Sequence, residues 1–252
     1  MPQPPGYLLL QHSRAELVAA ESVVAALGSV LDRKTLYAWA ATHPKRRPYA
    51  GRITAYGVPL PNGSERVVVR HSHHGGLLAR FTQDRFLPPT RAPEELEASL
   101  RLAEAGIPTP RVVAYAIYPA GRFFCRSDVV TEEIAPARDL GLALKEARDP
   151  AARRDLLMVV APLLAALAGA GVWHPDLNIK NILIGGAPEA RRAYLLDLDR
   201  VRFGTPNDPV IARANLARLR RSARKWRTQH SSGFSEAELH DLEEMAAGGG
   251  ER

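Results

Sequence analysis

His174-Pro-Asp-Leu-Asn-Ile-Lys-Asn-Ile-Leu-Ile184 is the stretch that decides the fold of this chain. It reads H-x-D-x-x-x-x-N and continues into an apolar run that predicts a buried strand. A second apolar run, Tyr194-Leu-Leu-Asp-Leu-Asp199, ends on carboxylates. Two strands joined by a short turn would bring Asp176, Asn181 and Asp197 onto neighbouring loops.

These three side chains suit one kind of chemistry. Phosphoryl transfer needs a carboxylate that aligns a hydroxyl, and an amide with a second carboxylate that hold Mg²⁺ on nucleotide phosphates. We therefore interpret Asp176 as a catalytic residue, and Asn181 and Asp197 as metal ligands. Asp and Asn are common in ordinary turns, so the hypothesis depends on the joint pattern of loop, strand, turn and second strand.

The bulk composition sets wider limits. The chain has 252 residues, enough for two lobes, and 46% of them are hydrophobic. Its single cysteine, Cys125, excludes an internal disulfide and lies in an apolar run typical of a core. No apolar run reaches the length of a membrane span, and no signal peptide is visible, so we expect a cytoplasmic protein. The net charge of +7 favours anionic partners.

The first 135 residues predict a mainly β lobe with a helix inserted before its last two strands. We expect an earlier helix over 14–27, capped by Ser13, and a helix over 93–105 that ends at Gly106. Pro61-Asn62-Gly63 is a hairpin signal. The expected strands cover 35–41, 52–60, 65–70, 112–117 and 122–134.

Two loops of this lobe carry further hypotheses. Residues 42–51 form a basic, turn-rich segment with Gly51 as its only glycine, where a kinase-like lobe would have its phosphate-covering loop. No G-x-x-x-x-G-K-[ST] motif is present, which argues against a P-loop enzyme. The histidines of 71–76 lack a nearby Cys or carboxylate at metal-binding spacing, so we expect them to face solvent.

Residues 136–252 predict a second, mainly helical lobe. The pattern over 140–171 is helical, with Pro162 as a kink and a leucine-rich core stripe. A further helix is expected over 215–227, with Trp226 on its apolar side and basic residues facing out. We expect the tail from about residue 246 to be disordered.

Several motifs together resemble the lipopolysaccharide core sugar kinases, in the branch that acts on 3-deoxy-D-manno-octulosonic acid (Kdo). The similarity covers roughly residues 50–227. Its motifs are Arg70-His-Ser-His-His-Gly-Gly-Leu-Leu-Ala-Arg80, Gly106-Ile-Pro-Thr-Pro110, the His174–Asn181 run, Asp197-Leu-Asp199 and Asn215-Leu-Ala-Arg-Leu-Arg-Arg-Ser222. The His-x-Asp motif is shared by all protein-kinase-like folds, whereas the first and last runs are narrower pointers to this branch.

The resemblance implies an α+β, two-lobed protein-kinase-like fold, with an antiparallel sheet in the N-terminal lobe and a mainly helical C-terminal lobe. It implies ATP and Mg²⁺ as cofactors and transfer to a Kdo hydroxyl on lipid A. The expected setting is the cytoplasmic face of the inner membrane, where the protein would be peripheral on an anionic surface.

The resemblance also assigns individual residues. Asp176 matches the catalytic-loop base, and Asn181 and Asp197 match the Mg²⁺ ligands. Glu95 matches the helix glutamate that pairs with a strand cation. That cation is usually lysine but is Arg70 here, and arginine has a different reach and geometry.

Several alternatives stay open. Glu97 competes with Glu95 as the partner of Arg70. Lys180 either neutralises charge on the moving phosphoryl group or is an exposed loop lysine. Asp199 either assists the metal or caps the following loop.

Other functions also stay open. They are a kinase of the same fold with a protein or small-molecule acceptor, and a nucleotide-binding pseudokinase, which Arg70 and the glycine-poor loop would favour. Nucleic-acid binding would leave the three site residues unused, and we do not expect it.

Overall fold

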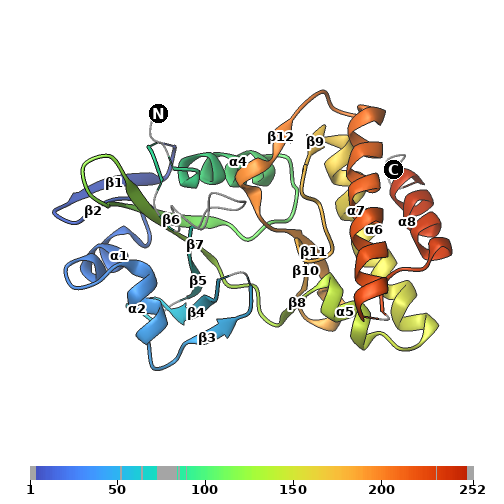
Figure 1. Cartoon of the computed structure of the whole chain (residues 1–252), viewed down its shortest axis with the longest axis horizontal. Coiled ribbons are helices and arrows are strands. Elements are labelled where there is room, and N and C mark those ends of the chain that lie inside the picture. Colours follow the sequence, from blue (N-terminus) through green and yellow to red (C-terminus); the bar gives the residue numbers. More distant parts are fainter. Residues whose placement is uncertain are drawn as a thin grey trace. The chain divides into compact units, whose positions relative to one another are not determined.

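The structure is a computed structural model that describes residues 4–51, 53–63, 65–72, 84, 86–88, 90–230 and 232–248 (Figure 1). The chain divides into two compact units. The first comprises Met1–Leu100 with Arg111–Glu133, and the second comprises Arg101–Pro110 with Ile134–Arg252. Residues 101–110, which the sequence assigned to the N-terminal lobe, therefore pack with the second unit. Residues 73–80 of the Arg70–Arg80 motif, which include the histidines at 73 and 74, lie outside the described residues.

The first unit is built on a seven-stranded antiparallel sheet in the order β1-β2-β6-β7-β5-β4-β3. Its strands are β1 (Tyr7–His12), β2 (Ala15–Ala20), β3 (Arg47–Tyr49), β4 (Ala55–Pro59), β5 (Arg66–His71), β6 (Val112–Pro119) and β7 (Cys125–Glu132). In β5, Val67 and Val69 are fully buried. Because side chains alternate along a strand, Arg70 lies on the opposite face from these valines.

The sheet confirms several local predictions. Residues 61–63 join the antiparallel strands β4 and β5, and Gly63 has a φ of 74°. Helix α4 (Ala92–Glu104) is followed by Gly106 with a φ of 68°. Cys125 is buried in β7.

The predicted helix over 14–27 is wrong. Residues 7–20 form the hairpin β1–β2, with Tyr7 opposite Ala20 and His12 opposite Ala15, and helix α1 (Val24–Leu31) begins only afterwards. Strand β2 lies between β1 and β6 and is buried on both faces. Its continuous apolar run therefore has no alternation, and periodicity alone cannot separate such a strand from a buried helix.

The predicted strand over 35–41 is also wrong, since helix α2 (Leu36–Thr42) occupies this segment. The Thr35 hydroxyl accepts a hydrogen bond from the Ala38 N–H at 3.1 Å, which is the N-cap interaction that starts a helix. The basic segment 42–51 then contains β3, so part of the expected loop is an edge strand.

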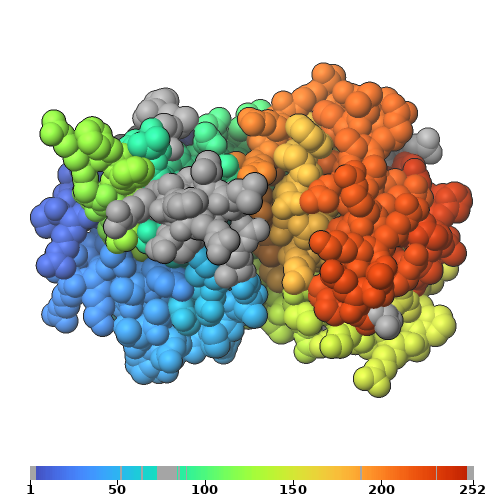
Figure 2. Space-filling view, in the orientation of Figure 1, coloured from blue at the N-terminus to red at the C-terminus, as the bar shows by residue number. Residues whose placement is uncertain are grey.

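The second unit contains the long helices of the protein. Its elements are β8 (Ala137–Asp139), α5 (Leu140–Glu146), α6 (Pro150–Gly169), β9 (Val172–Trp173), β10 (Ile182–Gly185), η1 (Pro188–Ala190), β11 (Arg192–Leu195), η2 (Leu198–Arg200), β12 (Arg202–Phe203), α7 (Pro209–His230) and α8 (Glu236–Gly248). Strands β11, β10 and β8 form one small sheet, and β12 pairs with β9. In the space-filling view, α7 and α8 (orange to red) form a continuous surface on one side of this unit (Figure 2).

The helical region predicted over 140–171 is divided in two. Asp149 accepts a hydrogen bond from the Ala152 N–H at 2.8 Å and starts α6, with Pro150 in the first turn. Pro162 lies inside α6. The predicted core stripe is confirmed, because its six members are all buried: Leu156, Leu157, Val160, Leu163, Leu164 and Leu167.

Helix α8 has no counterpart in the sequence prediction, and it contradicts disorder over 246–248. Ser235 and Glu238 form a capping box at its start. The Glu238 N–H donates to the Ser235 hydroxyl at 3.1 Å, and the Ser235 N–H donates to a Glu238 carboxylate oxygen at 2.7 Å. Arg153 of α6 binds the same carboxylate through Nε and Nη2. No helix in the described ranges has the length and apolar character needed to cross a membrane.

The contact between Arg153 and Glu238 predicts that the stability of the fold falls at acidic pH. Burial raises the pKa of Glu238, but the hydrogen bonds from Arg153 and Ser235 outweigh it and lower the pKa to about 2. A lowered carboxylate pKa stabilises the fold above the unfolded value of 4.5, and this contribution disappears as pH falls towards 2. We expect Glu238→Gln to lower the free energy of unfolding by about 2 kcal/mol at pH 7. The difference from the native protein should shrink below pH 4 in urea titrations. An equal difference at pH 7 and pH 2.5 would contradict the assignment.

Candidate active site

The loop between β9 and β10 is held by His174, which is fully buried. Its Nδ1 accepts a hydrogen bond from the Asp176 N–H at 3.2 Å. Its Nε2 therefore carries the proton and donates to the Leu196 carbonyl at 3.0 Å. Both ring nitrogens bind backbone, so His174 fixes the start of the loop against the end of β11.

Asn178 closes the same loop from inside. Its Oδ1 accepts hydrogen bonds from the N–H groups of Lys180 at 2.9 Å and Asn181 at 3.2 Å. Its Nδ2 donates to the Asp176 carbonyl at 3.0 Å. Asn favours such local side chain–backbone bonds, and here they set the turn that separates Asp176 from Asn181.

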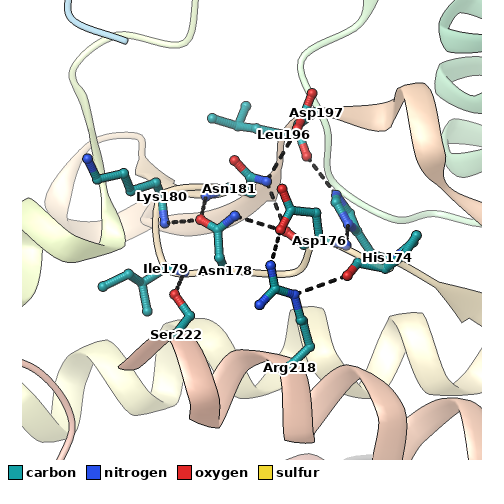
Figure 3. Close-up of polar contacts among 11 residues, drawn as sticks. His174, Asp176, Asn178, Ile179, Lys180, Asn181, Leu196, Asp197, Arg218 and Ser222 are labelled. Carbon is teal, nitrogen blue, oxygen red and sulfur yellow. Dashed lines mark hydrogen bonds and ion pairs between the residues drawn. The ribbon is translucent and has the colours of Figure 1, made fainter. Parts of the chain in front are cut away.

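Asp176, Asn181 and Asp197 converge in the structure (Figure 3). The Asn181 Nδ2 donates to the Asp176 carbonyl at 3.0 Å and lies 3.5 Å from Asp197 Oδ2. The Leu196 N–H donates to the Asn181 carbonyl at 2.9 Å, which ties the two loops together. Asp197 has a left-handed backbone with a φ of 62°, a conformation in which Asp and Asn are enriched.

The pair Asn181 and Asp197 fits a divalent cation of the Mg²⁺ type. The Asn181 Nδ2 is directed to protein oxygens, which leaves its Oδ1 as a ligand atom. Carboxylate and amide oxygens are the ligands that Mg²⁺ prefers, usually together with phosphates and water. Among the described residues there is no group of three or more His, Cys, Asp or Glu that could hold a metal ion. Asp199, the alternative ligand or cap, lies in η2 directly after Asp197.

Lys180 leaves the loop in another direction. Its ammonium lies 5.3 Å from the ring centroid of Trp226 on α7, a cation–π distance. Figure 3 shows the side chain pointing away from Asp176. In this conformation Lys180 contacts an aromatic ring and is not placed beside the Asp176 carboxylate.

Three residues of helix α7 hold the loop and the strand before it, and the sequence did not predict these contacts. Asn215 is buried; its Oδ1 accepts from the His174 N–H at 3.0 Å, and its Nδ2 donates to the Val172 carbonyl at 2.7 Å. Arg218 forms an ion pair with the Asp176 carboxylate and donates from Nε to the Pro175 carbonyl at 3.1 Å.

The third residue is Ser222, whose hydroxyl accepts a hydrogen bond from the Ile179 N–H at 3.2 Å. Asn215, Arg218 and Ser222 are three and four residues apart, so they share one face of α7. That spacing was visible in the sequence, but nothing local indicated which segment the face would contact.

The first unit holds the other predicted residues. Arg70 on β5 forms an ion pair with the buried Glu95 on α4, whereas Glu97 is exposed. Of the two glutamates considered, Glu95 is therefore the partner of Arg70. The binding of nucleotide phosphate by this pair remains a prediction.

His71, next to Arg70, does not face solvent as expected. Its Nδ1 lies 2.5 Å from an oxygen of the fully buried Asp128, and its Nε2 lies 3.3 Å from Asp84. Burial lowers the pKa of His71, but the two carboxylates raise it by more, so the pKa lies above its usual value. The other Asp128 oxygen accepts from the Tyr118 hydroxyl at 2.8 Å, so β5 ends on a fixed polar cluster.

Known proteins match this fold. A solved structure described as "WaaP in complex with acyl carrier protein" is similar with a TM-score of 0.56 and 21% identity, covering 92% of this chain and 88% of its own. Together with the β-rich first unit and the three convergent loop residues, this similarity defines a protein-kinase-like fold.

The sequence places the chain within that class. It belongs to the lipopolysaccharide kinase (Kdo/WaaP) family, whose description matches residues 49–245. A 3-deoxy-D-manno-octulosonic acid kinase of Haemophilus influenzae (strain PittEE) is 32% identical over 71% of this chain and 73% of its own length. A 3-deoxy-D-manno-octulosonic acid kinase of Vibrio parahaemolyticus is 31% identical over 74% of this chain and 76% of its own length. The chain is thus a kinase of this family, a phosphotransferase with a sugar hydroxyl as acceptor.

Proposed function

We propose that this protein transfers the γ-phosphoryl group of ATP to a hydroxyl of a Kdo residue in the lipid A inner core. The observation that carries the proposal is the convergence of Asp176, Asn181 and Asp197 in a chain of the Kdo/WaaP family. The names of the relatives supply the acceptor class.

Asp176 is proposed to accept a hydrogen bond from the attacking hydroxyl and to take its proton. A new oxygen–phosphorus bond forms while the bond to the β-phosphate oxygen breaks, and ADP leaves. Little covalent chemistry is required of the protein, so positioning and charge carry most of the catalysis. The hydrogen bonds of His174 and Asn178 supply that positioning, because they fix the backbone on both sides of Asp176.

The other predicted residues are proposed to handle phosphate charge. Asn181 and Asp197 would hold Mg²⁺, which neutralises phosphate oxygens when bound. Arg70, oriented by Glu95, would bind nucleotide phosphate oxygens through its planar fork. For Lys180 we keep the role of neutralising the transferred group, which would require its ammonium to leave Trp226.

A peripheral place on the inner membrane is part of the proposal. Four arginines of α7 are in ion pairs: Arg218, Arg220, Arg224 and Arg227. Arg213, Arg221 and Lys225 are exposed and have no ion-pair partner within the described ranges. Each basic residue near an anionic bilayer contributes about 1 kcal/mol, so these three support weak surface binding.

The test is transfer from ATP to defined acceptors, followed by mass spectrometry of the product. We expect Kdo-bearing lipid A to gain one phosphoryl group, and lipid A without Kdo to gain none. Turnover of only a protein or a soluble metabolite would replace the acceptor assignment. Nucleotide-induced thermal stabilisation without any turnover would identify a pseudokinase.

A further inference from the structure

Arg218 is held in a way that leaves one edge of its guanidinium available. Its Nε donates to the Pro175 carbonyl at 3.1 Å, and its Nη2 contacts Asp176 Oδ1. Within the described part of the chain, Nη1 has no hydrogen-bond partner. Figure 3 shows interactions from only two of the three guanidinium nitrogens. The N–H groups that point outward from the edge formed by Nη1 and Nη2 are therefore available to donate hydrogen bonds to a ligand.

The Arg218 side chain is partly exposed and its guanidinium is already oriented. The side chain of Arg218 is 33% exposed, whereas Asn215, one turn earlier on α7, is buried. Asn215 and Ser222 already hold the loop backbone to the helix, so Arg218 is not needed for that purpose. Two fixed contacts immobilise its guanidinium, and a preorganised fork loses little conformational freedom on binding a planar anion.

We propose that Arg218 is a specificity residue that binds the carboxylate of the acceptor sugar acid. This inference rests on the proposed function, which makes the acceptor an octulosonic acid with a carboxylate on the ring that is phosphorylated. A guanidinium edge matches a carboxylate with two parallel hydrogen bonds. The same guanidinium contacts Asp176 through Nη2, so a carboxylate on the Nη1–Nη2 edge would place the sugar ring beside the catalytic carboxylate.

Arg218 would then act twice. It orients Asp176, and it selects acceptors that carry a negative charge next to the reacting ring. A neutral hexose would leave the guanidinium edge without an anion and would not form the two charge-assisted hydrogen bonds. The segment Asn215–Ser222 would thus contain Arg218, which binds the carboxylate of the acceptor, together with Asn215 and Ser222, which hold the loop.

The experiment compares a soluble Kdo glycoside with the same glycoside whose carboxylate is converted to a carboxamide. The proteins are the native chain, Arg218→Gln, Arg218→Lys and the control Arg224→Gln. Arg224 lies on the same helix, and its partner Glu236 retains Arg227 when Arg224 is replaced. Thermal unfolding and the KM for ATP show whether each variant is folded and binds nucleotide.

For the native protein and the control we expect kcat/KM to favour the carboxylate by ~100-fold, the size of a charge-assisted hydrogen-bonded pair. In Arg218→Gln the preference should fall below ~5-fold, with an intermediate value for Arg218→Lys. A variant that loses the same factor on both acceptors would overturn the proposal and leave Arg218 as a positioning residue only. A native protein that phosphorylates neither glycoside nor any Kdo lipid would instead overturn the proposed function.

Discussion

Asp176→Asn is expected to lower kcat by ~10²–10⁴-fold, the range typical of a lost general base. The reason lies in how Asp176 is held. Its carbonyl accepts from Asn178 and Asn181 and its N–H donates to His174, so the loop depends on the backbone of this residue. The carboxylate itself meets only Arg218 among the described residues. An amide of the same size should therefore preserve the loop while losing the ability to take a proton.

The measurement is single-turnover transfer from ATP to a Kdo acceptor, with nucleotide affinity followed separately. We expect the Kd for ATP to change by less than ~3-fold, because Asp176 is not assigned to the phosphates. Asp241→Asn is the matched control, since Asp241 is an exposed aspartate on α8. If Asp176→Asn turned over at a third of the native rate or more, the hydroxyl-aligning role would have to move to another group.

The convergence of Asp176, Asn181 and Asp197 was predictable because their geometry is local. Two lie in one loop whose turn is set by Asn178, and the third follows a strand that pairs with the strand leaving that loop. In such a local arrangement, residues that are near one another in the sequence are also near one another in the structure. Arg218 is the opposite case. Its contact with Asp176 depends on how a distant helix packs, and a basic residue on an amphipathic helix gives no sign of its partner.

The same distinction explains the errors in the fold. The core stripe of α6 has the periodicity of a helix with one buried face, so it was predictable. Strand β2 is buried on both faces and has no period, and α2 is a short helix recognisable only by its Thr35 cap. Tertiary contacts determine the secondary structure of both segments. The sequence of either segment alone has only a weak preference for helix or strand.

The second large effect is expected at Asn215, where Asn215→Leu should lower the free energy of unfolding by about 2–5 kcal/mol. Leucine has a similar volume but can neither accept from the His174 N–H nor donate to the Val172 carbonyl. These backbone groups are next to fully buried side chains, and each would lose its partner away from water. The expected loss of stability comes from the desolvation of two unpaired backbone groups, which is larger than the net contribution of two hydrogen bonds.

Urea unfolding followed by tryptophan fluorescence suits this measurement, because Trp173 and Trp226 both lie in the second unit. Gln229→Leu provides the control: it makes a comparable amide-to-leucine change on the same helix at an exposed position, and it should stay within about 0.5 kcal/mol of the native protein. If both leucine variants had the same midpoint, Asn215 would not hold the loop. A selective loss at Asn215 would instead show that α7 stabilises the end of β9, which leads into the loop of His174 and Asp176. The conformation of this loop would then depend on a helix encoded some forty residues later.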